Sequence, residues 1–164
     1  MQGNWLKPLV AVAIIIAVTA AGAIYWSKRD NKVAPRLIMY DSQQVVNGER
    51  VYMEHCARCH GRYLEGQMNW QTPLPNGRLP APPHDDSGHS WHHPDSYLFG
   101  VTKYGMVPPY APEGYQSDMP AFAEVLSDQD IIDALLFIRG RWTENALEHQ
   151  RRVTNDVDGP YKGP

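Results

Sequence analysis

The chain of 164 residues has few cysteines and no excess of positive charge. Two cysteines are too few for a framework of several disulfides or for a four-cysteine zinc ribbon. A formal net charge of −3 lacks the basic excess that is typical of nucleic-acid-binding proteins. Charged residues make up 20% of the chain and hydrophobic residues 43%, so the composition is that of a folded protein. At this length we expect one domain with accessory segments.

An apolar run of 18 residues, Leu9–Trp26, lies near the N-terminus. At about 1.5 Å per residue, a helix of this length spans roughly 27 Å, which is close to the thickness of a hydrocarbon core. Its last two residues are aromatic, as is common at the membrane interface. We therefore predict a transmembrane anchor with its flanks in residues 1–32. The alternative is a cleavable signal peptide, with Lys7 as its basic region and Leu9–Val18 as its apolar core.

The remainder of the chain is acidic. From Val33 onward, 11 of the 15 Lys and Arg residues and 17 of the 18 Asp and Glu residues remain, which gives a net charge of −6. Such a charge favours basic partner surfaces over phosphate backbones. We expect residues 33–41 to form a tether, because Pro35 disfavours a helix at the residue before it. Residues 42–142 are then the globular domain, and residues 143–164 a short helix and a flexible tail.

The residues that carry chemistry lie in a Cys-x-x-Cys-His motif, at Cys56, Cys59 and His60. Residues three apart on a helical turn face the same way, so the two thiols can each form a thioether with one vinyl group of a porphyrin. The adjacent His60 is then placed to bind the iron as the proximal axial ligand. This motif is the attachment signature of a c-type haem, and it predicts one covalently bound haem c.

Two other interpretations of the motif fit less well. A thioredoxin-like dithiol is expected after a strand in a βαβ unit, and residues 42–54 have no strand pattern. A zinc site would need two further ligands among the histidines, which show no conventional spacing.

A methionine is expected as the second axial ligand, because His and Met together close the iron and raise its potential, which suits electron transfer. Met119 is preferred. Pro120 after it favours a rigid, extended loop, and about 60 residues separate it from the motif. The alternatives are Met106, Met68 or a histidine.

A histidine-rich stretch between the predicted ligands contains His84, His89, His92 and His93. Imidazoles with neighbouring carboxylates could bind copper or zinc, which would make the His84–His93 loop a metal-binding site. We favour a polar loop near the haem edge, in which Trp91 or one of the histidines donates a hydrogen bond to a haem propionate.

Local signals also predict helices. Ser42 is placed to cap a helix that leads into the motif. Residues Pro94–Tyr104 predict a short helix that ends at Gly105. Ser127 is predicted to cap a further helix, with acidic residues in its early turns and apolar residues on one side. Thr143–Arg152 adds a short surface helix, and almost nothing has the pattern of a strand, so the fold class is all-α.

Together these features resemble a membrane-anchored class I c-type cytochrome with a single haem, over about residues 42–142. The resemblance rests on the haem motif, the proline-rich middle, and Met119-Pro120 before a terminal amphipathic helix. It implies a small helical haem domain with long loops. The stretch 64–94 is longer and richer in Trp, Pro and His than the minimal fold needs.

The resemblance also implies particular contacts. An N-terminal helix crosses a C-terminal one at a small residue and aromatic side chains, and Gly48, Tyr52 and Phe137 match these positions. A proline carbonyl is expected to accept the Nδ1–H of His60. The candidates are Pro82, Pro80 and Pro83.

The function implied is electron transfer without catalytic side chains. We expect a membrane-tethered carrier, or a complex subunit, that passes single electrons between respiratory or photosynthetic complexes, from a quinol-oxidising complex to a terminal oxidase or another acceptor. The resemblance also implies that the haem is attached outside the cytoplasm, so the domain is expected in the periplasm on the inner membrane, although the basic residues after the span favour the opposite orientation. We expect no nucleic-acid partner and no small-molecule substrate. The alternative is a haem enzyme or gas sensor with an open or exchangeable sixth ligand.

Overall fold

The computed structural model describes Thr19 and residues 42–159. The chain divides into two units, residues 1–33 and 34–164. The predicted transmembrane run Leu9–Trp26, apart from Thr19, and the predicted tail after residue 159 lie outside the described residues. Among the helices of the described part, none is long and apolar enough to cross a membrane.

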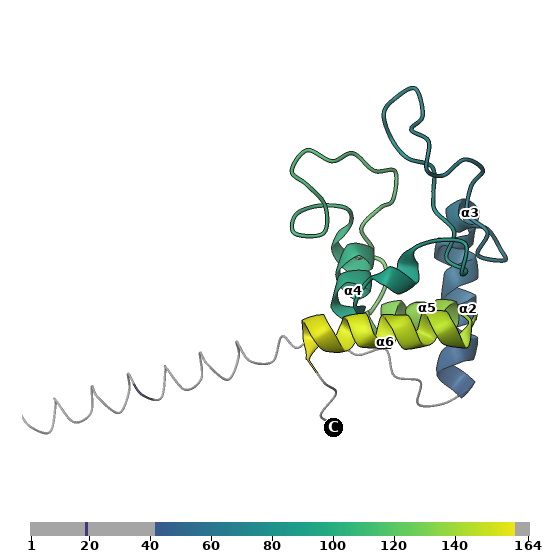
Figure 1. Ribbon diagram of the computed structural model, residues 1–164, viewed down its shortest axis with the longest axis vertical. Helices are drawn as coiled ribbons and strands as arrows, with labels where there is room; N and C mark the ends of the chain where they lie inside the picture. Colours follow the sequence, from purple (N-terminus) through teal and green to yellow (C-terminus); the bar gives the residue numbers. More distant parts are fainter. Residues whose placement is uncertain (1–18, 20–41, 160–164) are drawn as a thin grey trace, which may run out of the picture. The chain divides into compact units, whose positions relative to one another are not determined.

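Residues 42–159 are all-helical and contain no strand, which agrees with the predicted class (Figure 1). Figure 1 shows two long loops on the side of the domain away from α6; one follows α3 and the other follows α4. The elements in chain order are α2 (Ser42–His55), α3 (Ala57–His60), the 3-10 turn η1 (Ser90–His92), α4 (Asp95–Tyr104), α5 (Asp128–Arg139) and α6 (Glu144–Asp158).

Local capping determines several helix ends. The Ser127 hydroxyl accepts a hydrogen bond from the backbone N–H of Asp130 at 3.1 Å, and the Asp130 carboxylate accepts from the backbone N–H of Ser127 at 3.3 Å, which forms a capping box for α5. Helix α4 ends at Gly105, whose φ of 83° favours glycine. The predicted helix ends at Ser127 and Gly105 are therefore confirmed.

Helix α2 crosses α5 at a small residue followed by an aromatic pair. A Cβ built on Gly48 would lie 2.0 Å from the carbonyl oxygen of Asp133. Four residues later, the ring of Tyr52 packs on Phe137 with the ring centroids 5.4 Å apart. The side-chain amide of Asn47 donates to the Asp133 carboxylate across 2.7 Å. This is the crossing that the resemblance to class I cytochromes implies, and it fixes the end of α2 from which the motif continues.

Helix α6 differs from its prediction in length and in role. The sequence predicted a short surface helix over Thr143–Arg152, whereas the helix runs to Asp158 and packs one face against the rest of the domain. The buried positions recur every four residues and so lie on one face. Two of the three are polar, so the buried positions themselves do not form the apolar stripe by which a packed helix is recognised. The buried residues of α6 are Ala146, Gln150 and Thr154.

Helix α6 supplies hydrogen-bond acceptors to the N-terminus of α4, where Pro94 provides no side-chain cap. The Thr154 hydroxyl accepts from the backbone N–H of Asp95 at 3.2 Å. The Asp158 carboxylate accepts from the backbone N–H of Ser96 at 3.1 Å. The first backbone N–H groups of a helix have no acceptor within that helix, so the side chains of α6 cap the N-terminus of α4.

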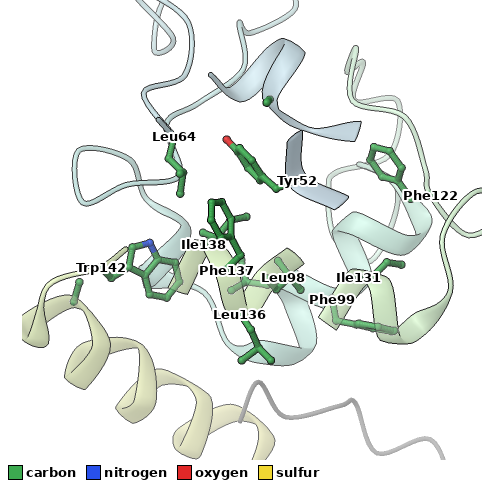
Figure 2. Packing of buried hydrophobic residues seen from close by; sticks show 13 residues of the cluster. Tyr52, Leu64, Leu98, Phe99, Phe122, Ile131, Leu136, Phe137, Ile138 and Trp142 are labelled. Atoms are coloured by element: carbon green, nitrogen blue, oxygen red, sulfur yellow. The ribbon is translucent and has the colours of Figure 1, made fainter. Parts of the chain in front are cut away.

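The hydrophobic core extends from this helical layer towards both long loops. Figure 2 shows Tyr52 and Phe137 near its centre, with Trp142 next to α6 and Phe122 on the opposite side. All four side chains are buried. Met119 is half-buried and packs against the same cluster. The core therefore connects the motif helices to the loop that carries the predicted methionine ligand.

Candidate haem site

The Cys-x-x-Cys-His motif continues the helical hydrogen bonding of α2. The N–H of Cys56 donates to the carbonyl oxygen of Tyr52 at 2.8 Å, and the N–H of His60 donates to that of Cys56 at 2.9 Å. Cys59 follows Cys56 by about one helical turn, so both side chains lie on one side of the turn. Both thiols are free and half-buried. The two sulfurs are thus arranged to react with one planar group.

Burial sets the protonation of the motif side chains. Burial, together with Cys59 beside it, raises the pKa of the Cys56 thiol to about 11, so this thiol is protonated at neutral pH. Burial lowers the pKa of His60, so its imidazole is neutral under the same conditions. A neutral imidazole is the form that can bind a metal.

His60 is buried, with its Nδ1 atom 2.9 Å from the carbonyl oxygen of Pro82. A carbonyl oxygen can only accept, so Nδ1 carries the proton and Nε2 keeps its lone pair. Nε2 is therefore the nitrogen with which this ring can bind iron. Of the three prolines that the sequence left open, Pro82 is the one whose carbonyl lies at this position.

A close backbone contact holds the Pro82 loop against the motif. The N–H of Gly66 donates to the carbonyl oxygen of His60 at 2.8 Å. Gly66 has a φ of 66°, and a Cβ there would lie 2.4 Å from the nitrogen of Pro83. A side chain at this position would push the loop away, so glycine is needed for the prolines to reach His60.

The ring of His84 stacks on the ring of His60, with the centroids 4.0 Å apart and the planes 23° from parallel. Its Nδ1 atom lies 2.8 Å from the hydroxyl oxygen of Ser90. Burial, with His60 and His89 nearby, holds the pKa of His84 well below 6.5, so the stacked ring is neutral.

Tyr52 connects the core to the turn after the motif. Its hydroxyl donates to the carbonyl oxygen of Gly61 at 2.8 Å, and the side chain is fully buried. Burial raises the pKa of Tyr52, so the hydroxyl keeps its proton and remains a donor. The aromatic pair at the helix crossing thereby also supports the haem motif.

The loop that carries Met119 is anchored on α4. The backbone N–H of Met119 donates to the Ser117 hydroxyl at 3.1 Å. After it, the N–H of Ala123 donates to the carbonyl oxygen of Lys103 at 3.0 Å. On the other side, the Asp118 carboxylate forms an ion pair with Arg78 from the loop after α3. Hydrogen bonds and an ion pair thus fix the chain on both sides of Met119.

The structure also places the two alternative methionine ligands, Met68 and Met106, and the predicted propionate donor Trp91. Met68 is 88% exposed, and Met106 is half-buried. The indole N–H of Trp91 donates to the carbonyl oxygen of Asp86 at 3.4 Å, and its ring stacks on His92 at 3.7 Å.

No group of three or more His, Cys, Asp or Glu side chains is placed to hold a metal ion, as far as the described residues extend. The imidazoles of the His84–His93 loop make ring contacts. His89 stacks on Trp70 with the centroids 5.3 Å apart, and His93 stacks on Tyr97 at 4.3 Å. Aromatic packing is therefore what the described residues show for this loop.

The donor set fits a covalently bound haem. It comprises two free thiols one helical turn apart and an adjacent imidazole with Nε2 available. A methionine thioether lies on an anchored, half-buried loop. These are the donors that a c-type haem with histidine and methionine ligation uses.

Comparison with known proteins assigns the family. The family described as "Cytochrome C oxidase, cbb3-type, subunit III" matches residues 43–138, more than half of the chain. The chain belongs to this cytochrome family. It is also 30% identical, over 118 residues, to the gluconate 2-dehydrogenase cytochrome c subunit of Pantoea cypripedii. That alignment covers 72% of this chain and 24% of the relative, so the chain spans about a quarter of the relative's length. No solved structure matches the chain.

The match to the cytochrome family covers the haem motif, Pro82 and Met119, and it ends within α5. Sequence reasoning did not identify two features of this c-type cytochrome, the stacking of His84 on His60 and the ion pair between Arg78 and Asp118. Both join parts of the chain through the long loop after α3, and neither has a local sequence signal.

Proposed function

We propose that this c-type cytochrome is a single-haem electron-transfer protein. Its haem c would be joined by thioethers to Cys56 and Cys59, with His60 and Met119 as axial ligands. The orientation of His60 carries the proposal. Its Nδ1 is held by the Pro82 carbonyl at 2.9 Å, which leaves Nε2 as the iron-binding atom next to two free thiols. When bound, the haem supplies a one-electron couple.

The side chains act by holding and shielding this group. Cys56 and Cys59 fix its position, and the Pro82 carbonyl keeps the proton of His60 on Nδ1 and orients the ring. Met119, on its anchored loop, would supply a thioether as the second axial ligand and keep other molecules from the metal. Hydrogen bonds hold both His60 and the loop of Met119, and ligands that move little when an electron is gained or lost would favour fast electron transfer.

We also propose that residues 1–32 anchor the cytochrome in the inner membrane through Leu9–Trp26, with the haem domain in the periplasm. The length and apolar composition of this run support the anchor. The proposed haem c supports the periplasmic side, because haem of this kind is attached outside the cytoplasm. A tether of this kind raises the effective concentration of the haem domain near membrane partners without new contacts.

The proposed partners are membrane redox complexes. We propose that the cytochrome accepts electrons from a quinol-oxidising complex or a dehydrogenase and passes them to a terminal oxidase or another acceptor, as a free carrier or as a subunit. The family description names an oxidase subunit, and the relative from Pantoea cypripedii is the cytochrome c subunit of a dehydrogenase. Identifying the proteins that co-purify after gentle solubilisation of native membranes would distinguish donor from acceptor complexes.

The haem itself is tested on the full chain, produced in a host that attaches haem c. After denaturation and acid-acetone extraction, the polypeptide should stay coloured. The peptide that contains Cys56 and Cys59 should gain the mass of one haem, with one haem per chain by the pyridine haemochrome assay. A variant with both cysteines changed to serine should be colourless. A colourless wild-type polypeptide with an unmodified peptide contradicts the proposal.

A second measurement separates an electron carrier from a haem enzyme or gas sensor. If both axial positions are closed, the reduced cytochrome should bind carbon monoxide only slowly and incompletely. Rapid, complete formation of the carbon monoxide complex would show an open or exchangeable position and support the alternative.

The anchor is tested by fractionation, because the full chain should stay with membranes after carbonate washing. A form with residues 1–32 replaced by a cleavable signal peptide should be released in soluble form.

A further inference from the structure

His84 restrains the imidazole that we propose as the proximal haem ligand. His60 is held along one edge by the hydrogen bond from Nδ1 to the Pro82 carbonyl, at 2.9 Å. A single hydrogen bond allows the ring to tilt about the bond. The ring of His84 lies against the face of His60, 4.0 Å away and 23° from parallel, and so opposes that tilt. The hydrogen bond at the edge of the ring and the stacked imidazole on its face together define the plane of the His60 ring.

His84 is itself fixed by three hydrogen bonds to different parts of the chain. Its Nδ1 atom lies 2.8 Å from the hydroxyl oxygen of Ser90, a buried residue of η1. Its backbone N–H donates to the carbonyl oxygen of Leu64 at 2.7 Å. Its carbonyl oxygen accepts from the indole N–H of Trp142 at 2.7 Å. A side chain restrained at both its backbone and its ring can serve as a rigid support.

We propose that His84 is a positioning residue that sets the orientation of the His60 imidazole plane in the haem-bound cytochrome. The inference rests on the proposed function, because it requires His60 to bind the haem iron. The angle of the axial imidazole plane determines its π overlap with the iron d orbitals, and partners of a metal ligand tune a metal site in this way. His84 thus acts on the iron through His60.

A planar side chain is what this role requires. Leucine at position 84 would fill much of the volume but would present no flat face to His60. Phenylalanine would keep a flat ring and lose the bond to Ser90. A purely space-filling role predicts that both variants behave alike, whereas a positioning role predicts that His84→Phe stays closer to the wild type than His84→Leu does.

The test compares His84→Leu, His84→Phe and Ser90→Ala in the full, haem-loaded chain. The matched control is His149→Leu, which removes a half-buried imidazole of α6 that meets the ring of Trp91 edge-on, with the centroids 5.3 Å apart. Covalent haem content and the methionine–iron(III) charge-transfer band are measured first. The EPR g values of the ferric state, the hyperfine shifts of the haem methyl groups in NMR, and the reduction potential follow.

We expect His84→Leu to keep its haem and its methionine band but to shift the low-field g value, the methyl shifts and the potential. His84→Phe should restore most of the wild-type values, Ser90→Ala should shift the same signals by less, and His149→Leu should match the wild type. Wild-type spectra for His84→Leu with intact haem would overturn the inference alone, as would equal shifts for His149→Leu.

If His84→Leu does not accumulate, Ser90→Ala decides the question, because it keeps both rings and removes the one hydrogen bond that holds the imidazole of His84, while the two hydrogen bonds of its backbone remain. Wild-type g values and methyl shifts in Ser90→Ala would then overturn the inference. A wild-type chain that lacks covalent haem or the methionine band would contradict the proposed function, and this inference with it.

Discussion

Gly48 lies so close to Asp133 that a Cβ on the glycine would be 2.0 Å from the carbonyl oxygen of Asp133. The same Cβ would lie 3.0 Å from the Cβ of Phe137. Non-bonded atoms do not approach to 2.0 Å, so the distance between α2 and α5 depends on the missing side chain. Because α2 continues directly into Cys56, this crossing also determines where the haem motif lies on the core.

Gly48→Ala is expected to force α2 and α5 apart. Overpacking of a tight contact costs about 1–3 kcal/mol, and the relaxation here must involve backbone. The urea midpoint should fall accordingly, measured by far-UV circular dichroism on the haem-loaded protein. Gly140→Ala is the matched control, because Gly140 has a helical φ of −65° and its nearest neighbour would be 3.4 Å away. Its midpoint should stay near that of the wild type. Equal midpoints for both variants would show that the crossing relaxes without cost.

Met119→Ala should open the iron without releasing the haem. The thioether is lost, so the long-wavelength charge-transfer band should disappear, the reduction potential should fall, and carbon monoxide should bind the reduced form rapidly. Met68→Ala is the control, since Met68 is 88% exposed. Its spectrum and potential should be those of the wild type. A Met119→Ala protein with the wild-type band would exclude Met119 as a ligand.

The haem motif and two helix ends could be predicted because they depend on neighbours in the sequence. The spacing of Cys56 and Cys59 follows from helical periodicity, and the capping box at Ser127 is a four-residue signal. Gly105 marks the end of α4 because a positive φ favours glycine. The all-helical class follows from the same local signals.

Contacts made through the long loop after α3 could not be predicted in this way. The choice of Pro82 over its neighbours depends on where Gly66 turns the chain back, and nearby residues do not determine that. The stacking of His84 on His60 depends on the same turn. The length of α6 was underestimated because polar residues such as Gln150 are buried on its packed face.

Asp130→Asn should lower the free energy of unfolding at neutral pH but make that free energy less sensitive to acid. The Asp130 carboxylate accepts hydrogen bonds from the Ser127 hydroxyl at 2.6 Å and the Asn47 amide at 3.2 Å, which lower the pKa of Asp130 below 3.8. As the pH falls through 3.8, the unfolded chain takes up this proton before the folded chain does, so the stability from Asp130 is present above that pH and lost below it. Urea titrations at pH 7 and at about pH 3.5 measure the difference.

Ser127→Ala checks the cause of that pH dependence. It removes the hydroxyl that makes the largest contribution to the low pKa of Asp130 and keeps the carboxylate. The free energy of unfolding of the variant should be about 1 kcal/mol lower than that of the wild type at neutral pH, as expected for the loss of an N-cap. On acidification, its free energy of unfolding should fall by less than that of the wild type. If wild type, Ser127→Ala and Asp130→Asn respond to acid in parallel, other groups dominate the acid sensitivity.

Thr154→Val tests whether α6 is held by its buried hydrogen bonds. The Thr154 hydroxyl accepts from the backbone N–H of Asp95 at 3.2 Å and from the side-chain amide of Gln150 at 3.0 Å. Valine has nearly the same shape but takes this acceptor away from the buried backbone N–H of Asp95, which costs about 1–3 kcal/mol, while the Gln150 amide keeps the Asp95 carboxylate as its acceptor at 2.6 Å. The haem spectrum should not change, while the urea midpoint should fall. Thr154→Ser keeps the oxygen and should lie between valine and wild type. Equal midpoints for the valine and serine variants would mean that the Thr154 hydroxyl does not help to hold α6.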